Sequence, residues 1–260
     1  MKLLNLGCGQ TYHKDWVNID FKSTGPGVIA HDLTSGLPYA EAEFDVVYSS
    51  HLLEHFNKSF APQFLKECFR VLKPGGVIRI AVPDLETIAR LYLMLLEKAR
   101  QGDDEARGAY DWIMIELFDQ MVRNVPGGNF VKHLSSTPLK AESFIVSRAG
   151  KEASDVLAYL NNPVNVETVS KLTFPDESKL TADQIGNFRL SGEVHQWMYD
   201  SYSLGRLLSE VGFIDEKSVR PDESLIPGFM EYCLDTDENC IPRKPDSLFM
   251  EAVKYIQNSQ

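Results

Sequence analysis

Short apolar segments bounded by turns dominate the first 84 residues and restrict the folds open to this chain. Five of them are long enough for a strand but too short for a typical helix, and they cover residues 2–6, 16–21, 28–33, 44–50 and 77–82. Such strands, joined by turns or helices, are typical of a parallel sheet that is covered on both faces. We therefore predict an α/β fold with a Rossmann-like, doubly wound and mostly parallel sheet.

One amphipathic helix lies between the fourth and fifth predicted strands. Its apolar positions recur at helical spacing from Phe64 to Leu72, with Ser59 as the expected N-cap and Pro62 in the first turn. The run KPGG at 73–76 then predicts a turn, because proline and glycine suit its two central positions.

After the fifth strand the pattern becomes helical. We predict helices over 85–100 and about 104–123, and a further helix near 152–160. The region 129–193 is polar and irregular, and no strand can be placed there. These segments predict a mainly helical insertion.

The α/β pattern returns at Asp200, which is expected to cap a helix that ends at Gly212. Strands are predicted at 213–219 and 248–253, and we expect this pair to be antiparallel. The predicted division is therefore a Rossmann-like core and an insertion after its fifth strand. The core would comprise 1–86 and 194–260, and the insertion 87–193.

Glycines and polar side chains follow several predicted strands at the edge where such sheets bind ligands. Gly7, Asp20, Asp32 and Ser49 would gather there. Glycine lets the backbone approach a ligand, exposed amides hold an anionic group, and an aspartate after the second strand accepts hydrogen bonds from a ribose diol. The alternative for each aspartate is a solvated turn residue or a helix cap.

Four motifs in sequence order resemble those of class I S-adenosylmethionine (SAM)-dependent methyltransferases, and in particular the type 11 methyltransferase-domain group. They are LNLGCG, NID, HDLTSGLPYAEAEFDVVYSSHLLEHF and ECFRVLKPGGVIRIAVPD, within residues 2–84. A looser resemblance covers HQWMYDSYSLGRLLSEVGF at 195–213. The resemblance implies that the core binds SAM and that S-adenosylhomocysteine is the product.

The resemblance also implies roles for individual residues of this chain. Asp20 would bind the ribose hydroxyls, Asp32 would face the adenine amino group, and Leu33 would pack near the ring. The residues expected beside the methionine part of the cofactor are Asn5, Gly7, Cys8, Gly9, Ser49 and Ser50. Asn5 stands where the family often has an acid, so the charge that would attract the cofactor's ammonium group is missing.

Histidine is the natural general base at neutral pH if the acceptor is a hydroxyl. His51, at the mouth of the expected substrate pocket, and His195, before the last core helix, are the predicted catalytic residues. His51, His55 and Tyr199 are the predicted acceptor-binding residues. For each histidine the alternative is a structural or surface role, and for Tyr199 it is packing.

The connection between the first two predicted strands is unusually short. Residues 10–15 leave no room for the usual helix, so we expect an abbreviated crossover. Residue 2 already lies in the first strand, and we expect no N-terminal helices over the cofactor. We hypothesise that the insertion at 87–193 serves as a lid and helps to form the acceptor pocket.

Metal, nucleic acid and membrane are not expected partners. The sequence HLLEH at 51–55 matches a zinc-peptidase pattern, but it directly follows a buried strand, and the four cysteines form no C-x-x-C pair, so we predict no metal. The formal charge of -11 argues against nucleic-acid binding. No apolar run is long enough for a membrane span and no signal peptide is evident, so a cytoplasmic location is expected. The apolar face of the insertion is either core or an oligomer interface.

The predicted function is methyl transfer from SAM to a small-molecule or glycosyl acceptor, by O- or N-methylation. The main alternative is a SAM-binding regulatory or scaffold protein without transferase activity. A nicotinamide-dependent oxidoreductase would share the sheet, but Tyr12 occupies the place of the third glycine of G-x-G-x-x-G. A cofactor-independent binding module would keep the fold and use the insertion as an interaction surface.

Overall fold

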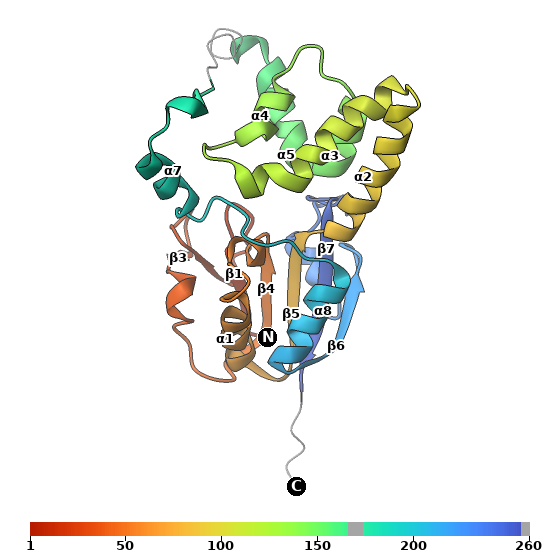
Figure 1. The fold of residues 1–260 in the computed structure, drawn as a ribbon. Helices are drawn as coiled ribbons and strands as arrows, with labels where there is room; N and C mark the ends of the chain where they lie inside the picture. Colours follow the sequence, from red (N-terminus) through yellow and green to blue (C-terminus); the bar gives the residue numbers. More distant parts are fainter. Residues whose placement is uncertain (166–173, 256–260) are drawn as a thin grey trace. The chain divides into compact units, whose positions relative to one another are not determined.

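A computed structural model describes residues 1–165 and 174–255, and its chain divides into two compact units (Figure 1). The core unit comprises Met1–Asp84, Trp197–Pro242 and Ser247–Gln260. The helical unit comprises Leu85–Gln196 and Arg243–Asp246.

The core unit contains one seven-stranded sheet with the order β3-β2-β1-β4-β5-β7-β6. The strands are β1 Leu3–Leu6, β2 Val17–Asp20, β3 Val28–Ala30, β4 Phe44–Ser50, β5 Leu72–Pro83, β6 Phe213–Val219 and β7 Ser247–Lys254. The first five are parallel, whereas β7 runs antiparallel to both β5 and β6. The predicted Rossmann-like fold is confirmed, and β6 and β7 pair antiparallel as expected.

The predicted turn at 73–76 lies inside β5 as an irregularity. Leu72 pairs with Phe44, and pairing resumes at Val77 opposite Val46, so the intervening residues form a register shift. Gly75 has a φ of +76°, which is the left-handed conformation that glycine adopts without strain.

Two helices cover one face of the sheet. They are α1 (Ala61–Val71) and α8 (Ser201–Val211), which contact each other on that face (Figure 1). Alternate strand residues point toward them, because successive side chains of a strand face opposite sides. The buried strand residues on this side include Leu4, Leu6, Val47, Ile78, Ile80 and Met250.

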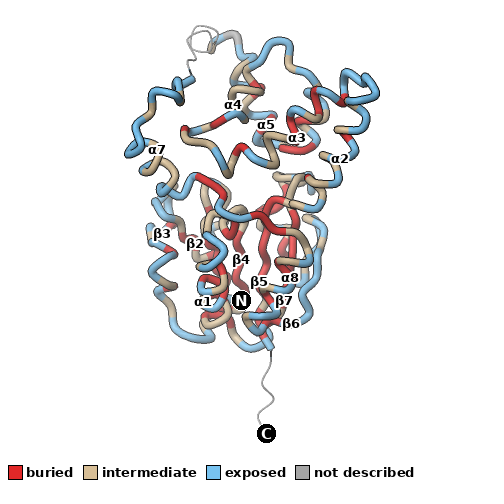
Figure 2. The backbone as a smooth tube through the Cα atoms, viewed as in Figure 1, coloured by how far each residue is buried: buried red, intermediate tan, exposed pale blue. Residues whose placement is uncertain are grey.

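The opposite face is covered by the β6–β7 segment, which we define as residues 220–242. Its regular structure is limited to the short helix η5 (Phe229–Tyr232). Ile226, Phe229 and Leu234 of this segment are buried against Trp16 and against strand residues that point away from α1 and α8. These strand residues are Leu3, Val46 and Tyr48. Figure 2 shows the buried strands at the centre of the core unit.

The ends of α1 and α8 are set by local hydrogen bonds. Asn57 accepts hydrogen bonds from the amides of Ser59 and Phe60, and Phe60 is the N-cap of α1, so the expectation that Ser59 caps this helix is wrong. Asp200 caps α8, as predicted, and it does so in a capping box with Ser203, which was not predicted.

No helix lies between β1 and β2, so the expected abbreviated crossover is confirmed. The amides of Gly7 and Cys8 both donate to the carbonyl oxygen of Ile19, at 2.9 and 3.1 Å. These bonds hold the start of the short connection against the end of β2.

The helical unit contains α2 (Leu85–Arg100), α3 (Asp104–Val122), α4 (Gly128–Leu134), α5 (Glu142–Asn161) and α7 (Ala182–Arg189). The helices predicted over 85–100 and 104–123 are present, and the helix predicted near 152–160 is the second half of α5. α4 and α7 were not predicted. Residues 166–173 lie outside the described residues.

Gly150 interrupts α5 with a φ of +58° and a ψ of -131°. A β-carbon there would lie 2.5 Å from the Pro245 side chain and 2.7 Å from the Arg243 carbonyl oxygen. The close approach joins Arg243–Asp246 to the helical unit. Among the described residues, no helix is both long and apolar enough to cross a membrane.

Candidate cofactor and acceptor site

The strand order places a switch point between β1 and β4, because the chain runs outward from β1 to β3 and then returns to the other side of β1. In open α/β sheets, ligands bind beyond the carboxyl ends of the strands at such a point. The predicted cofactor residues that follow β1 or end β2 and β4 lie at this edge: Gly7, Cys8, Gly9, Asp20, Ser49 and Ser50.

The glycine loop after β1 has a backbone that favours glycine at two positions. Gly7 and Gly9 have φ values of +66° and +53°. A β-carbon on Gly7 would lie 2.9 Å from the Leu52 side chain, whereas one on Gly9 would meet no atom within 4 Å. Gly7 is therefore needed for internal packing, and Gly9 leaves open space at the sheet edge.

Asp20 connects the end of β2 to the glycine loop. Its Oδ2 accepts a hydrogen bond from the Gly9 amide at 2.8 Å, and Thr24 donates its hydroxyl to the Gly9 carbonyl oxygen. Asp20 Oδ1 accepts a hydrogen bond from the Lys22 amide at 3.4 Å. A carboxylate has more acceptor sites than these two bonds use, and the residue is half-buried. Asp20 thus retains the capacity to accept hydrogen bonds from a ribose diol, and the loop fits a nucleoside cofactor.

Asp32 has the local role that the alternative prediction describes. Its Oδ1 accepts hydrogen bonds from the amide and hydroxyl of Thr34 at 2.9 and 2.7 Å and caps the short helix η1 (Leu33–Ser35). These bonds lower the pKa of Asp32. The carboxylate is exposed and Leu33 is buried, and their contacts with adenine stay a prediction.

Asn5 and Cys8 are buried beside the glycine loop. Asn5 donates from its side-chain amide to Asn18 Oδ1 at 3.1 Å, across the β1–β2 pair. Burial, with a smaller contribution from Asp20, raises the pKa of Cys8 to about 11. The raised pKa favours the neutral thiol form of Cys8 at neutral pH.

His51 directly follows β4 and is held by two side chains. Its Nδ1 lies 3.1 Å from Glu54 Oε1, and its Nε2 lies 2.8 Å from Ser247 Oγ. Glu54 is fully buried on the short helix η2 (Leu53–His55), and Ser247 begins β7. His51 is part-buried, while Ser49 is buried and Ser50 is half-buried at the end of β4.

Sequence reasoning did not assign roles to Glu54 and Ser247. Glu54 was visible as the acid of HLLEH, and its i,i+3 spacing from His51 was the available signal. Ser247 had no such signal, because 196 residues separate it from His51.

Tyr199 lies just before α8, in the core unit, and is buried. Its hydroxyl has no hydrogen-bond partner among the described residues. Burial, and secondarily the negative charge of Glu54, raises the pKa of Tyr199, so the hydroxyl is neutral. The predicted acceptor-binding role of Tyr199 stays a prediction.

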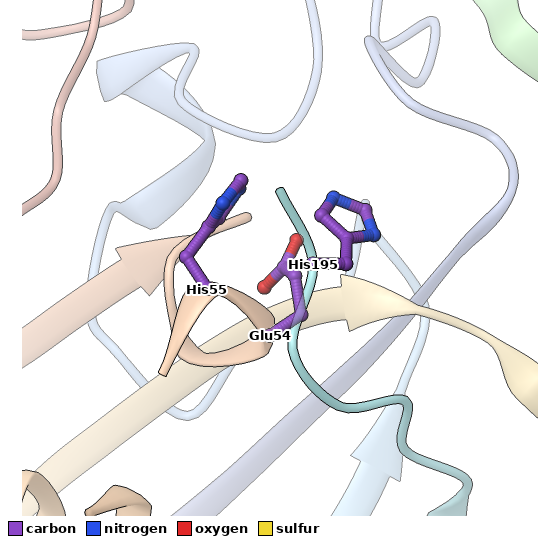
Figure 3. A group of neighbouring side chains, drawn as sticks. All are labelled: Glu54, His55 and His195. Atoms are coloured by element: carbon purple, nitrogen blue, oxygen red, sulfur yellow. The ribbon is translucent and has the colours of Figure 1, made fainter. Parts of the chain in front are cut away.

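The other two predicted histidines belong to different units. Figure 3 shows the side chains of Glu54 and His55 on η2 of the core unit. His195 is buried in the helical unit, where its amide donates to the Gln120 carbonyl oxygen at 3.0 Å. Glu54 and His55 are of residue types that can bind a metal ion. Within the described part of the core unit, no third side chain of this kind completes a group with them.

Comparison with known families supports the motif-based prediction. Residues 13–80 match the family described as "Methyltransferase domain". A probable S-adenosylmethionine-dependent methyltransferase of Mycolicibacterium smegmatis is 32% identical over 104 residues, which are 34% of this chain and 40% of that protein. Residues 13–80 therefore resemble a methyltransferase domain, and SAM is the cofactor named in the description of the relative.

Two solved structures resemble the chain over most of its length. One is the putative methyltransferase in complex with the Trm112 activator of Haloferax volcanii, with 12% identity, a TM-score of 0.42, and coverage of 98% of this chain and 83% of that one. The other is a SAM-dependent methyltransferase from Archaeoglobus fulgidus, with 12% identity, a TM-score of 0.40, and coverage of 97% and 86%. At these scores we draw no argument from either.

Proposed function

We propose that this chain transfers a methyl group from SAM to a small-molecule or glycosyl acceptor, by O- or N-methylation. The aligned part spans about 40% of the curated relative, so the reaction of the whole protein is our inference. The observation that carries it is the bond from the Gly9 amide to the Asp20 carboxylate, which joins the glycine loop to the end of β2 at the switch point.

The residues at the sheet edge divide into a cofactor set and an acceptor set. Asp20 would accept the ribose hydroxyls, and the glycine loop would lie along the methionine part, with Ser49 and Ser50 beside it. His51 would face the acceptor, because it follows β4 directly and lies beside the switch point. In this class of reaction, SAM supplies an electrophilic methyl group, and the protein supplies alignment and exclusion of water.

The cofactor assignment is tested by isothermal titration of the full chain with SAM, with S-adenosylhomocysteine and with NAD. We expect saturable binding of the first two and none of NAD. Asp20→Asn should weaken binding at least tenfold, because it removes the charge that favours the ribose contacts. The matched control is Asp15→Asn, an exposed aspartate on the β1–β2 connection, which should leave binding unchanged.

Detection of methylated product separates an enzyme from a SAM-binding regulator. The purified chain would be incubated with isotopically labelled SAM and a set of sugars and small alcohols and amines. Release of S-adenosylhomocysteine with label in the acceptor supports the proposal. Tight SAM binding without transfer to any acceptor favours the regulatory alternative.

We also propose that the insertion at 87–193 acts as a lid over the acceptor. The chain leaves β5 at Asp84 and returns at Tyr199, and these two residues form a parallel bridge in the core unit. The chain therefore leaves the core unit and re-enters it at two neighbouring residues. S-adenosylhomocysteine should slow limited proteolysis within 87–193, and an unchanged cleavage rate would count against a lid.

A further inference from the structure

A serine, a histidine and a glutamate lie side by side at the carboxyl edge of β4, with a hydrogen bond between the first two and an ion-pair distance between the last two. Ser247 Oγ lies 2.8 Å from His51 Nε2, and His51 Nδ1 lies 3.1 Å from Glu54 Oε1. All three residues belong to the core unit, and they come from the start of β7, the end of β4 and η2. Exposure falls along the line, from half-buried Ser247 to fully buried Glu54.

This geometry favours one tautomer of His51. Glu54 Oε1 lies 3.1 Å from Nδ1 and can only accept, so its negative charge favours the ring that carries its proton on Nδ1. In the neutral ring Nε2 then has a free lone pair and accepts the hydroxyl proton of Ser247. His51 is thereby oriented as a base whose proton source is the Ser247 hydroxyl.

The backbone of His51 supports a functional reason for this position. Its φ of +51° is in the left-handed region, which a non-glycine residue adopts at a cost on the order of 1 kcal/mol or more. Its amide donates to the Ala81 carbonyl oxygen at 2.9 Å and so continues the β4–β5 pairing one residue past the strand. In this conformation the imidazole lies between Ser247 and Glu54.

Tyr199 adds a second polar group near this line. Its buried hydroxyl has no partner among the described residues, and it is close enough to Glu54 for the carboxylate charge to affect it. A buried hydroxyl without a partner is costly, and a polar ligand would remove that cost. The Tyr199 hydroxyl is therefore a second buried polar group close to Glu54.

We propose that the acceptor atom is a hydroxyl oxygen and that Ser247, His51 and Glu54 remove its proton; this inference rests on the proposed methyl transfer. The acceptor oxygen forms a bond to the methyl group while the methyl–sulfur bond breaks and the sulfonium becomes a neutral thioether. The acceptor proton passes to Ser247 Oγ, and the Ser247 proton passes to His51 Nε2. Glu54 stabilises the resulting imidazolium, which later loses the proton to water.

An alcohol benefits from this arrangement more than an amine does. A neutral alcohol is a weak nucleophile and must lose its proton as the bond to carbon forms, so a base lowers the barrier. A neutral amine already has a nucleophilic lone pair and releases its proton to water afterwards. His51 acts on the Ser247 hydroxyl, and Glu54 is a positioning residue that acts through His51.

The first test reads the His51 tautomer and needs neither cofactor nor acceptor. The full chain is labelled with ¹⁵N-histidine, His51 is assigned with His51→Gln, and the ring nitrogens are followed by long-range proton–nitrogen spectra. We expect the neutral ring to carry its proton on Nδ1. Glu54→Gln keeps the side-chain volume and should shift the population toward the Nε2 proton, whereas Ser247→Ala should retain the Nδ1 proton. A wild-type ring protonated on Nε2 would overturn the proposal.

The second test uses paired acceptors that differ only in a hydroxyl or an amine, with release of S-adenosylhomocysteine as the readout. We expect turnover of the hydroxyl members, a loss in kcat on the order of 10²–10⁴-fold in His51→Gln, and a smaller loss in Ser247→Ala. Turnover confined to the amines would contradict the proposal. Titration of the wild type with SAM separates failure of the proposed function from failure of this inference. Absence of SAM binding refutes the proposed function. SAM binding together with a His51 ring that shows no preference for the Nδ1 proton refutes only this inference.

Discussion

The two faces of the core sheet are covered in different ways. On one face α1 and α8 pack through apolar side chains. On the other, the β6–β7 segment has little regular structure, so its backbone groups need other partners. Many of these partners come from Arg79 of β5 and Glu251 of β7, which are both fully buried.

Arg79 is the centre of a charged network under the β6–β7 segment. It donates to Asp235 at 2.6 Å, to Glu251 at 2.7 Å and to the Glu223 carbonyl oxygen at 2.9 Å. Glu251 in turn accepts from the Leu225 amide at 2.7 Å. Burial alone would lower the pKa of Arg79, but the two carboxylates raise it overall, so the guanidinium stays charged.

The comparison shows that helices can cover a sheet by apolar contact alone, because they satisfy their own backbone groups. An irregular segment needs buried polar anchors to do the same. Such anchors are sensitive to the loss of one member, since the remaining charges stay buried without a partner. The predictions below test this difference.

Arg79→Met should have the largest effect, a loss of about 3–5 kcal/mol in the free energy of unfolding. The substitution leaves Asp235 and Glu251 buried without their cation, and urea denaturation would measure the loss. Lys73→Met on the same strand is the control, because the partly exposed Lys73–Asp45 pair should contribute only about 0–1 kcal/mol. Equal effects of the two variants would refute the anchoring role of Arg79.

Leu65→Ala on α1 tests the helical face and should cost about 3 kcal/mol. Leu65 is fully buried, and its truncation removes apolar contact and leaves a cavity. Hydrogen exchange distinguishes the two faces: Leu65→Ala should lower amide protection in α1, and Arg79→Met should lower it first at Leu225 and Ile226. Loss of protection on the same amides in both variants would show that the faces are not independent.

Asp200→Ala should cost about 1 kcal/mol, because it removes the capping box of α8. The Ser203 amide would lose its partner at 2.7 Å. Asp15→Ala, an exposed aspartate outside any helix, is the control for the loss of charge. Thermal denaturation measures both, and a neutral Asp200→Ala would show that tertiary packing alone sets the start of α8.

Glu67→Gln should have the smallest effect, at most about 1 kcal/mol at pH 7, because the ion pair is partly exposed. Arg70 lowers the pKa of Glu67 from 4.5 to about 2. The folded-state pKa is depressed, so the contribution of Glu67 is complete above about pH 4.5 and is lost as the pH falls through about 2. The stability difference between wild type and Glu67→Gln should therefore shrink between these values. A difference that does not depend on pH would show that the charge is irrelevant.

Much of the core could be predicted because its signals are local. The apolar runs, the glycines after β1 and the cap at Asp200 each depend on neighbouring residues. Ser59 was assigned wrongly because Asn57, two residues earlier, forms the competing hydrogen bonds. In the helical unit, α4 and α7 were missed because each is short, so neither displays enough turns for a periodic pattern.

The sequence by itself determined most strands and helices of the core, the glycine loop and the acid at the end of β2. Only the tertiary structure decided which side chains meet: Ser247 with His51 across 196 residues, and Asp235 with Arg79 across 156. The physical reason is that periodicity and turn chemistry act over a few residues. Contacts between distant side chains depend instead on the order of the strands in the sheet and on which face each residue occupies.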